Sequence, residues 1–437
     1  MYLRGSKLSM KRRRRVTSPL RVMVLSVLIA VGLYVNFVIM PTVPPLFVPT
    51  PTPTLPPETY ISDAQTLESE GKYNQAIQAY EEAIRVDPKN MNNYISLARL
   101  HTYLASYEEA VENAEKALMI NQSSAVAHAL RGYALGKLGD YLEAEAALEA
   151  AIELEPNNYL PYALLAEITA NKYETGIGDQ TTLDEAIELS HKARELNANA
   201  LETHRARAII LELTGSWNDG QNIEQAAQEY QAAISINPNI ASLHLGLGRV
   251  YRTMQVLPKA LEEFNRAVAL NPTDPWGYSY LSTTYAANGE FVRAIQFGLK
   301  AVEQDPANPY WRGNLGQLYY RQKQYLDARK HLTLAVKGGM SDEGVEVTPV
   351  SPNGVREVGY YSSFGLTMAN LGECGEALEI SQLLLQNYSN DEVTAFNAQE
   401  MVNICQSILE NGTPTPPAVE TQPAEEEVGG ESGAAGG

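Results

Sequence analysis

The sequence predicts an all-α protein, a solenoid of paired helices that is preceded by one transmembrane helix. Three observations lead to this fold class. Small residues recur at near-regular intervals from Ala76 to Ala377, an apolar run of 19 residues lies at Val22–Met40, and Pro41–Pro57 holds eight prolines in 17 residues. The first pattern indicates packed repeats, the second a membrane span and the third a stiff spacer.

Alanine marks the second helix of each predicted repeat. Successive alanines are 34 to 49 residues apart, and another alanine follows seven positions later in eight of nine repeats. The first set consists of Ala76, Ala110, Ala144, Ala186, Ala226, Ala260, Ala294, Ala328 and Ala377. Because seven residues make two helical turns, both positions lie on one face, where small side chains let another helix approach closely.

The first helix of each repeat has its own pattern, a large residue directly before a small one. Leu165-Ala166 and Leu315-Gly316 are examples, and a turn glycine such as Gly139 or Gly289 often follows. With the paired alanines and a closing proline, these residues resemble the tetratricopeptide repeat, whose period is ~34 residues. The resemblance covers residues 57 to about 391 as nine units, and it implies a right-handed superhelix of helix pairs.

The chain divides into seven predicted segments. They are a basic cytoplasmic tail (1–21), the transmembrane helix (22–40), a Pro/Thr-rich stalk (41–57), repeats one to eight (58–340), an inserted loop (341–357), the ninth repeat with a capping helix (358–411) and a disordered acidic tail (412–437). The inserted loop is either a hinge or a passive surface loop, since long insertions cost little loop entropy.

The apolar run Val22–Met40 would span ~28 Å as a helix, close to the ~30 Å hydrocarbon core of a bilayer. The alternative is a cleaved secretory signal, but this run is long for one and no small-x-small cleavage site follows Met40. The basic cluster Lys11–Arg15 predicts a cytoplasmic N-terminus. We therefore expect a single-pass protein of the inner or plasma membrane, with its repeats outside the cytoplasm.

Charge is distributed unevenly along the chain. The formal net charge is −19, and residues 1–40 carry eight Lys or Arg and no acid. The remainder holds 25 basic against 52 acidic groups, a balance of −27. Nucleic-acid binding depends on neutralising phosphates, so this composition argues against a nucleic-acid partner.

No catalytic, cofactor or metal motif is found in the sequence. It lacks H-E-x-x-H, a P-loop, G-x-S-x-G and C-x-x-C. His128, His204 and His244 occupy the same place in different repeats, too far apart to bind one metal ion. The sequence therefore predicts a protein that is not an enzyme and that needs no cofactor or metal.

The chain contains two cysteines, Cys374 and Cys405. Cys374 lies in the turn of the ninth repeat, and Cys405 lies near the end of the capping helix. First helices run parallel from repeat to repeat in this family, so the two side chains are expected to lie close together. They either form a disulfide that holds the cap or remain as two buried thiols.

In the tetratricopeptide family the first helices line a concave groove in which peptides dock. Helical geometry selects the residues that face this groove. They are Asn92, Arg99, Tyr103, Tyr133, Lys137, Arg205, Arg249, Arg252, Trp276, Gln317, Tyr320 and Arg321. Their cations and aromatic rings predict an extended anionic or planar ligand, whereas the alternative is that they are solvated helix residues with no common ligand.

The leading functional prediction is a membrane-anchored scaffold for protein–protein interaction, with partners that the sequence does not identify. A glycan- or wall-binding module and an enzyme-accessory module of the cell envelope are the alternatives. The family's carboxylate clamp needs particular Lys and Asn residues on adjacent first helices, and only scattered matches exist, so binding of chaperone tails is not implied.

Overall fold

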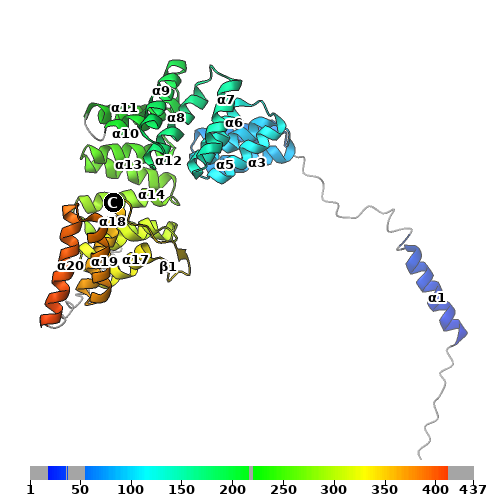
Figure 1. The fold of residues 1–437 in the computed structure, drawn as a ribbon. Coiled ribbons are helices and arrows are strands. Elements are labelled where there is room, and N and C mark those ends of the chain that lie inside the picture. Colours follow the sequence, from blue (N-terminus) through cyan, green and yellow to red (C-terminus); the bar gives the residue numbers. More distant parts are fainter. Residues whose placement is uncertain (1–17, 36, 38–54, 216–219, 412–437) are drawn as a thin grey trace, which may run out of the picture. The chain divides into compact units, whose positions relative to one another are not determined.

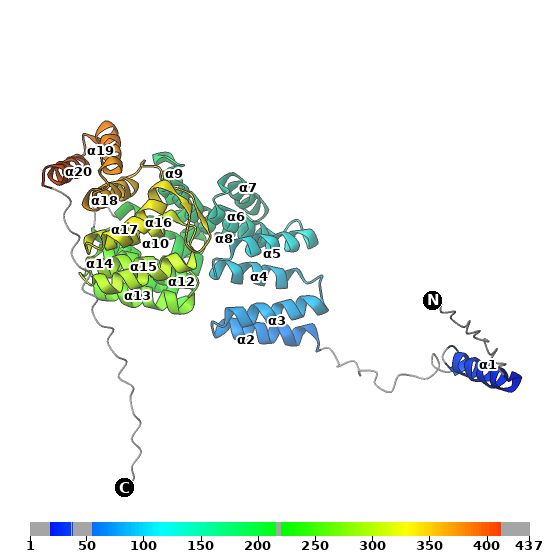
Figure 2. The same ribbon diagram turned by 90° about the horizontal axis from the view of Figure 1, so that it is seen from below.

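The computed structural model describes residues 18–35, 37, 55–215 and 220–411. The chain divides into two units, Met1–Thr59 and Tyr60–Gly437. The first unit contains helix α1, and the second contains the helical array (Figures 1 and 2). Most of the predicted stalk and all of the predicted acidic tail at 412–437 lie outside the described residues.

Helix α1 covers Pro19–Tyr34, with Ser18 as its N-cap and Val35 as its C-cap. Its 16 residues span ~24 Å at 1.5 Å per residue, less than the ~30 Å of bilayer hydrocarbon. Among the described residues, no helix has both the length and the apolar character needed to cross a membrane. The assignment to a cell membrane with the repeats outside the cytoplasm is therefore contradicted, and the transmembrane helix predicted over Val22–Met40, of which positions 36 and 38–40 lie outside the described residues, is not found.

The array consists of helix pairs followed by a single last helix. The pairs are α2 (Pro57–Ser69) with α3 (Tyr73–Val86), α4 (Met91–Tyr103) with α5 (Tyr107–Ile120), α6 (Ala125–Leu138) with α7 (Tyr141–Leu154), α8 (Tyr159–Glu174) with α9 (Gln180–Leu196), α10 (Leu201–Gly215) with α11 (Gly220–Ile236), α12 (Ala241–Thr253) with α13 (Leu257–Leu270), α14 (Pro275–Ala287) with α15 (Phe291–Gln304), α16 (Pro309–Arg321) with α17 (Tyr325–Lys337) and α18 (Val355–Asn370) with α19 (Cys374–Tyr388). Helix α20 (Glu392–Asn411) packs on α18 and α19 as the predicted capping helix.

The paired small residues form the contact between the helices of each repeat. The alanines from Ala76 to Ala377 and their partners seven residues later are all buried. Large side chains fill the space that small residues leave, as Tyr230 does against Gly246 and Phe264 does against Gly248. The predicted solenoid of helix pairs is confirmed by this packing.

In the turns within the repeats, the residue that ends the first helix has a positive φ, in the left-handed region of the Ramachandran plot. Gly139 and Gly289 have φ of 94° and 81°, as the turn glycines predict. In three other repeats Ala105, Gln255 and Lys323 adopt φ near 60° at the same place. The tight turn is therefore imposed by the packing of the two helices, even where the residue has a Cβ.

The insertion before the ninth repeat packs against the array. It contains a short antiparallel hairpin of β1 (Gly339–Met340) and β2 (Glu346–Val347). Glu343 in the hairpin accepts a hydrogen bond from the buried Arg312 at 3.0 Å, and the Tyr361 hydroxyl donates to the Val350 carbonyl at 3.0 Å. Contacts on both sides hold the segment in place.

A disulfide joins Cys374, at the start of α19, to Cys405 in α20, with Cα atoms 5.5 Å apart. Cys405 and its neighbour Met401 are buried among residues of α18 and α19. The bond therefore fixes the capping helix to the last repeat.

We predict that this disulfide forms in the protein in solution. Denatured, unreduced chain should then incorporate no iodoacetamide, and reduced chain should incorporate two equivalents, one at each of its two cysteines. Intact-mass measurement before and after reduction provides the check. Incorporation of two equivalents without reduction would show that the capping helix is held by packing alone.

The superhelix of the second unit brings early repeats against later ones. The Tyr73 hydroxyl donates to Asn237 Oδ1 at 2.9 Å, and Asn271 Nδ2 donates to the Leu104 carbonyl at 3.2 Å. Tyr103 also packs against the apolar cluster formed by α10 to α14. These contacts join the ends of helices in the early repeats to helix ends and turns of the later ones.

Candidate functional site

The twelve predicted groove residues lie in several environments. Tyr133 and Lys137 of α6, Arg205 of α10 and Arg249 of α12 belong to a closed region in which side chains of the chain contact one another. Those of α16 lie along an open stretch of the inner face. The structure therefore does not bring the twelve together on one surface.

Glu167 of α8 is the centre of the closed region. Its carboxylate accepts hydrogen bonds from the Tyr133 hydroxyl at 3.0 Å and from Arg205 Nε at 2.8 Å, and it lies 2.6 Å from Lys137 Nζ. Glu167 is 2% exposed and Arg205 is 6% exposed. Three predicted groove residues thus bind a carboxylate from their own chain.

The pKa of Glu167 reflects this arrangement. Burial acts to raise the pKa of the carboxyl, but Arg205, Lys137 and the hydrogen bond from Tyr133 outweigh it and lower the pKa to about 2. Burial raises the pKa of the Tyr133 hydroxyl, which stays protonated and able to donate. The region is a satisfied buried ion network.

A second internal carboxylate continues the network along the inner face. Glu212 of α10 binds Arg249 of α12 through two hydrogen bonds, from Nε at 2.8 Å and from Nη2 at 2.7 Å. It also accepts from the Tyr230 hydroxyl at 3.1 Å. Arg249 is therefore occupied by an intramolecular bidentate pair.

Sequence reasoning missed both Glu167 and Glu212 as partners of the predicted groove residues. Glu167 interrupts the apolar run Leu164-Leu165-Ala166 and Ile168. A lone acid inside such a run is buried only if cations pair with it, so this interruption was the available signal. Glu212 carries the same signal, because it interrupts the apolar run Ile209-Ile210-Leu211 and Leu213.

The remaining residues of α4 have separate surroundings. Asn92 is exposed, and its backbone N–H donates to the Asn90 side chain that caps the helix. The Tyr103 ring lies 5.7 Å from that of Tyr73, and burial raises the pKa of its hydroxyl. Arg99 is half-buried. Of these residues, Tyr103 lies at the contact between early and late repeats, whereas Asn92 lies at the opposite end of α4.

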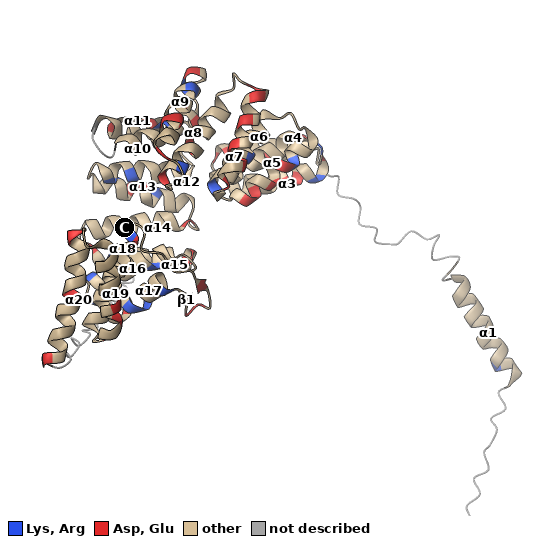
Figure 3. Ribbon diagram, in the orientation of Figure 1, with Lys and Arg blue, Asp and Glu red and all other residues tan. Residues whose placement is uncertain are grey.

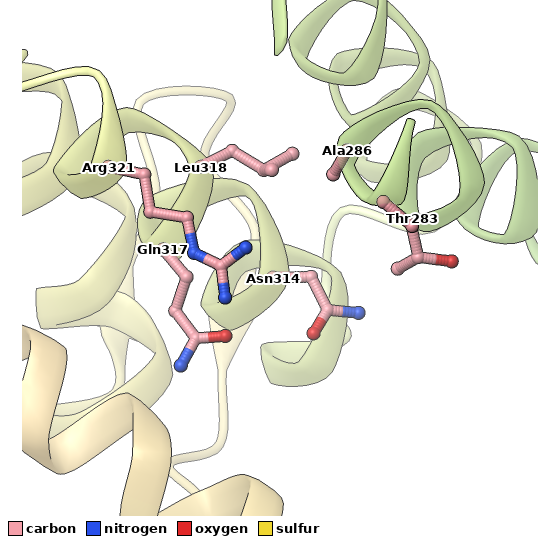
Figure 4. A pocket seen from close by; sticks show the side chains of 7 residues that line it. Thr283, Ala286, Asn314, Gln317, Leu318 and Arg321 are labelled. Carbon is pink, nitrogen blue, oxygen red and sulfur yellow. The ribbon is translucent and has the colours of Figure 1, made fainter. Parts of the chain in front are cut away.

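Between α14 and α16 the inner face contains a pocket of about 250 Å³. It is lined by Thr283, Ala286, Ala287, Asn314, Gln317, Leu318 and Arg321. Figure 4 shows the α16 side chains Asn314, Gln317, Leu318 and Arg321 on the side of that helix that faces Thr283 and Ala286 of α14. Two of the predicted groove residues, Gln317 and Arg321, therefore share one site.

The polar groups of this pocket are partly engaged. Asn314 Oδ1 accepts from the Tyr360 hydroxyl at 2.7 Å, and Gln317 Nε2 donates to Ser363 Oγ at 3.3 Å. These bonds fix both amides and leave the Asn314 amino group and the Gln317 carbonyl for a ligand. They supply hydrogen-bonding groups suited to a peptide main chain.

Arg321 is the cation of the pocket, and it is exposed. Among the residues that the structure describes, no carboxylate lies within ion-pairing distance of its guanidinium. Acidic and basic residues are interspersed along the helices of the array (Figure 3), so what sets this arginine apart is its place in the pocket and not the local charge.

The other predicted groove residues lie beside the pocket. Arg252 donates to Thr283 Oγ1 at 2.9 Å and lies over the Tyr280 ring at 5.3 Å. Trp276 is 47% exposed and meets the buried Trp311 edge to face at 4.8 Å. The Tyr320 ring lies 6.1 Å from that of Tyr325. None of them lines the pocket with Arg321.

The three histidines at equivalent positions of different repeats each contact a nearby carboxylate or main-chain carbonyl. His244 contacts Glu263 at 2.7 Å and the Pro238 carbonyl at 2.9 Å, and His204 contacts Glu229 at 2.5 Å. His128 contacts the Gln122 carbonyl at 3.0 Å. These contacts give each ring a structural role.

Family models of the tetratricopeptide repeat match the chain at several places. Models described as "TPR repeat" or "Tetratricopeptide repeat" match residues 65–103, 92–124, 125–158, 219–275, 263–296 and 281–343. The matches to 92–124 and 125–158 follow the helix pairs α4–α5 and α6–α7, whereas the others begin or end within helices. Residues 159–218 fall between them, in the region of the two lengthened repeats.

Curated relatives share the repeats over part of their length. The "Tetratricopeptide repeat and J domain-containing co-chaperone DNJ1" of Cryptococcus neoformans is 26% identical over 202 residues, which make up 45% of this chain and 38% of that protein. The "Protein STIP1 homolog" of Dictyostelium discoideum is 31% identical over 86 residues, 20% of this chain and 15% of that protein. The matches thus span well under half of either relative.

Among solved structures, the hetero-tetramer "APC/C hetero-tetramer Cut9-Hcn1" contains a chain with the same fold. The superposition has a TM-score of 0.60 at 15% sequence identity and covers 74% of this chain and 59% of that one. At this identity the likeness concerns the path of the helices and not the residues of any site.

Proposed function

This chain is a tetratricopeptide repeat protein, and we propose that it is a scaffold that binds an acidic, extended segment of a partner protein between α14 and α16. The pocket lies on the inner face, which the first helices of the repeats form. Its fixed amides suit a peptide main chain, and Arg321 suits a carboxylate.

The single observation that carries this proposal is the difference between Arg321 and the three inner cations Lys137, Arg205 and Arg249, each of which pairs with a glutamate of the chain. Lys137 of α6 and Arg321 of α16 occupy equivalent places in their repeats. Each follows a glycine by five residues, Gly132 in α6 and Gly316 in α16. Lys137 is paired with Glu167, which follows Leu165-Ala166 on the next first helix. The residue that follows Phe364-Gly365 at the same place of α18 is Leu366.

The internal carboxylates are thus missing at this point of the inner face. Lys137, Arg205 and Arg249 each pair with a glutamate of the chain. Around Arg321 the pocket presents Ala286, Ala287 and Leu318 in place of an acid. An acidic side chain from a partner would supply what Glu167 and Glu212 supply elsewhere.

The test is the affinity of the full chain for a fluorescein-labelled Gly/Ser peptide with three central glutamates, measured by fluorescence anisotropy. We expect Arg321→Ala to weaken binding about 10- to 100-fold, because a hydrogen bond to a charged group contributes ~1.5–3 kcal/mol. The physical reason is the loss of the one unpaired cation of the pocket.

Two controls make the result specific to the site. Arg266→Ala removes another exposed arginine, on the second helix α13 and outside the pocket, and should leave the affinity unchanged within a factor of two. A peptide with three glutamines should bind at least ten times more weakly than the acidic one. Equal losses for the two arginine variants would reject the site.

A further inference from the structure

A segment that carries the chemistry expected of the partner follows α20 in the same chain. Residues 412–437 contain five glutamates and neither lysine nor arginine. They are Glu420, Glu425, Glu426, Glu427 and Glu431. The consecutive Glu425–Glu427, flanked by small residues and Pro423, are of the same kind as the acidic ligand proposed for the pocket.

The capping helix carries the chain to the vicinity of Arg321. Helix α20 packs along α18, and α18 packs along α16. Burial raises the pKa of the Tyr320 hydroxyl, and Tyr325 and the Glu400 carboxylate of α20 add to this rise. Glu400 therefore lies within electrostatic range of the residue next to Arg321.

The intervening chain is long enough to reach the pocket. From Glu400 to the end of α20 at Asn411 the helix advances ~16 Å, at ~1.5 Å per residue. From Asn411 to Glu425 the chain has 14 residues and can span up to ~46–50 Å, at ~3.3–3.6 Å per residue. This reach exceeds the return path along α20 by a wide margin.

We propose that Glu425–Glu427 occupies the Arg321 pocket of its own chain and competes there with an acidic partner. The competition rests on the function proposed above, whereas the docking of the tail does not. The charges are complementary, because Arg321 has no carboxylate partner among the described residues and the tail carries acids without compensating cations.

The strength of this contact is set by two opposing effects. A tether of this length gives an effective concentration on the order of millimolar. Competition of two- to ten-fold at this concentration corresponds to a tail dissociation constant of about 0.1–1 mM, so a partner that binds more tightly readily displaces the tail. A partner with additional contacts to the Asn314 and Gln317 amides would displace it.

The docking is tested by zero-length crosslinking in the full chain. The amine introduced by Arg321→Lys should form an amide with Glu425, Glu426 or Glu427 on treatment with a carbodiimide, in a product with the mass of a single chain. Arg266→Lys, on the outer helix α13, is the matched control and should give no such product. Crosslinks from position 321 only to body carboxylates such as Glu400, or only between two chains, would overturn the proposal.

The competition is tested with the same fluorescent acidic peptide. The triple variant Glu425→Gln/Glu426→Gln/Glu427→Gln should bind it about two- to ten-fold more tightly than the natural chain, as expected for release of a weak competitor at millimolar effective concentration. Addition of Arg321→Ala should abolish this gain. Unchanged affinity in the triple variant would refute the competition.

The two proposals fail in different ways. If no variant binds the peptide while the tail crosslinks to position 321, the tail docks but the pocket does not serve this external ligand. If the peptide binds through Arg321 while no tail crosslink forms, the scaffold function holds and the internal competitor does not exist.

Discussion

Replacement of Glu167 by glutamine should destabilise the protein by about 3–5 kcal/mol, the cost typical of removing one partner of a buried ion pair. The amide keeps the shape of the side chain but cannot neutralise Arg205, which is almost fully buried, or Lys137. Two cations are then left in a region of low dielectric constant. The free energy of unfolding in urea, measured by far-ultraviolet circular dichroism, is the appropriate quantity.

The effect should depend on pH in a defined direction. The pKa of Glu167 is lowered in the folded chain from its ordinary value of 4.5 to about 2. The carboxylate therefore stabilises the fold above pH 4.5, and this stabilisation is lost as pH falls toward 2. The gap in unfolding free energy between the natural chain and Glu167→Gln should be full at pH 7 and shrink steadily below pH 4.5.

An exposed ion pair provides the control for Glu167. Glu195 contacts Lys192 at 3.2 Å, and both side chains are about half exposed or more. Glu195→Gln removes the same charge and should change the unfolding free energy by less than about 1 kcal/mol at pH 7. A loss below 1 kcal/mol for Glu167→Gln as well would show that the network is not stabilising.

Replacement of Leu148 by alanine should cost about 2–5 kcal/mol, the range for removing a buried leucine side chain. Leu148 of α7 is 0% exposed and packs where a Cβ on Gly132 of α6 would come within 2.8 Å of it. The space it fills between the two helices cannot close around an alanine. Because each repeat packs only on its neighbours, the loss should appear first as faster amide hydrogen exchange in α6, α7 and α8.

Leu142 on the same helix is the matched control. It is 81% exposed at the start of α7, so Leu142→Ala removes the same atoms from a solvated position. Its effect on unfolding should stay within about 0.5 kcal/mol, with exchange in α6 to α8 unchanged. Equal effects of the two substitutions would contradict the assignment of Leu148 to the interior of the repeat.

The repeat pattern predicted the helices well because it records local packing. The contact between two neighbouring helices requires small residues at fixed places, and Ala144 and Ala151 are buried where the spacing places them. The capping helix predicted within 358–411 is α20, which covers Glu392–Asn411. These features depend on residues that are close in the sequence.

The groove was predicted less well because it depends on residues far apart. Helical geometry placed Tyr133, Lys137 and Arg205 on the inner face, but the carboxylate that binds all three belongs to Glu167 on another helix. A list of inward positions does not show which of them are already paired. The membrane prediction failed for a different reason, since hydropathy was counted to Met40 whereas α1 ends at Tyr34.

The sequence by itself determined that this chain is an array of helix pairs, because each pair is specified by small residues, turns and caps within about 34 residues. Only the tertiary structure decided which inner cations are available. Contacts such as that between Arg205 and Glu167 join positions 38 residues apart, and they occupy inner cations with carboxylates of the chain itself. Arg321 is available to a ligand because no described carboxylate lies within ion-pairing distance of it. This availability follows from the arrangement of the neighbouring helices and not from the residues next to Arg321 in the sequence.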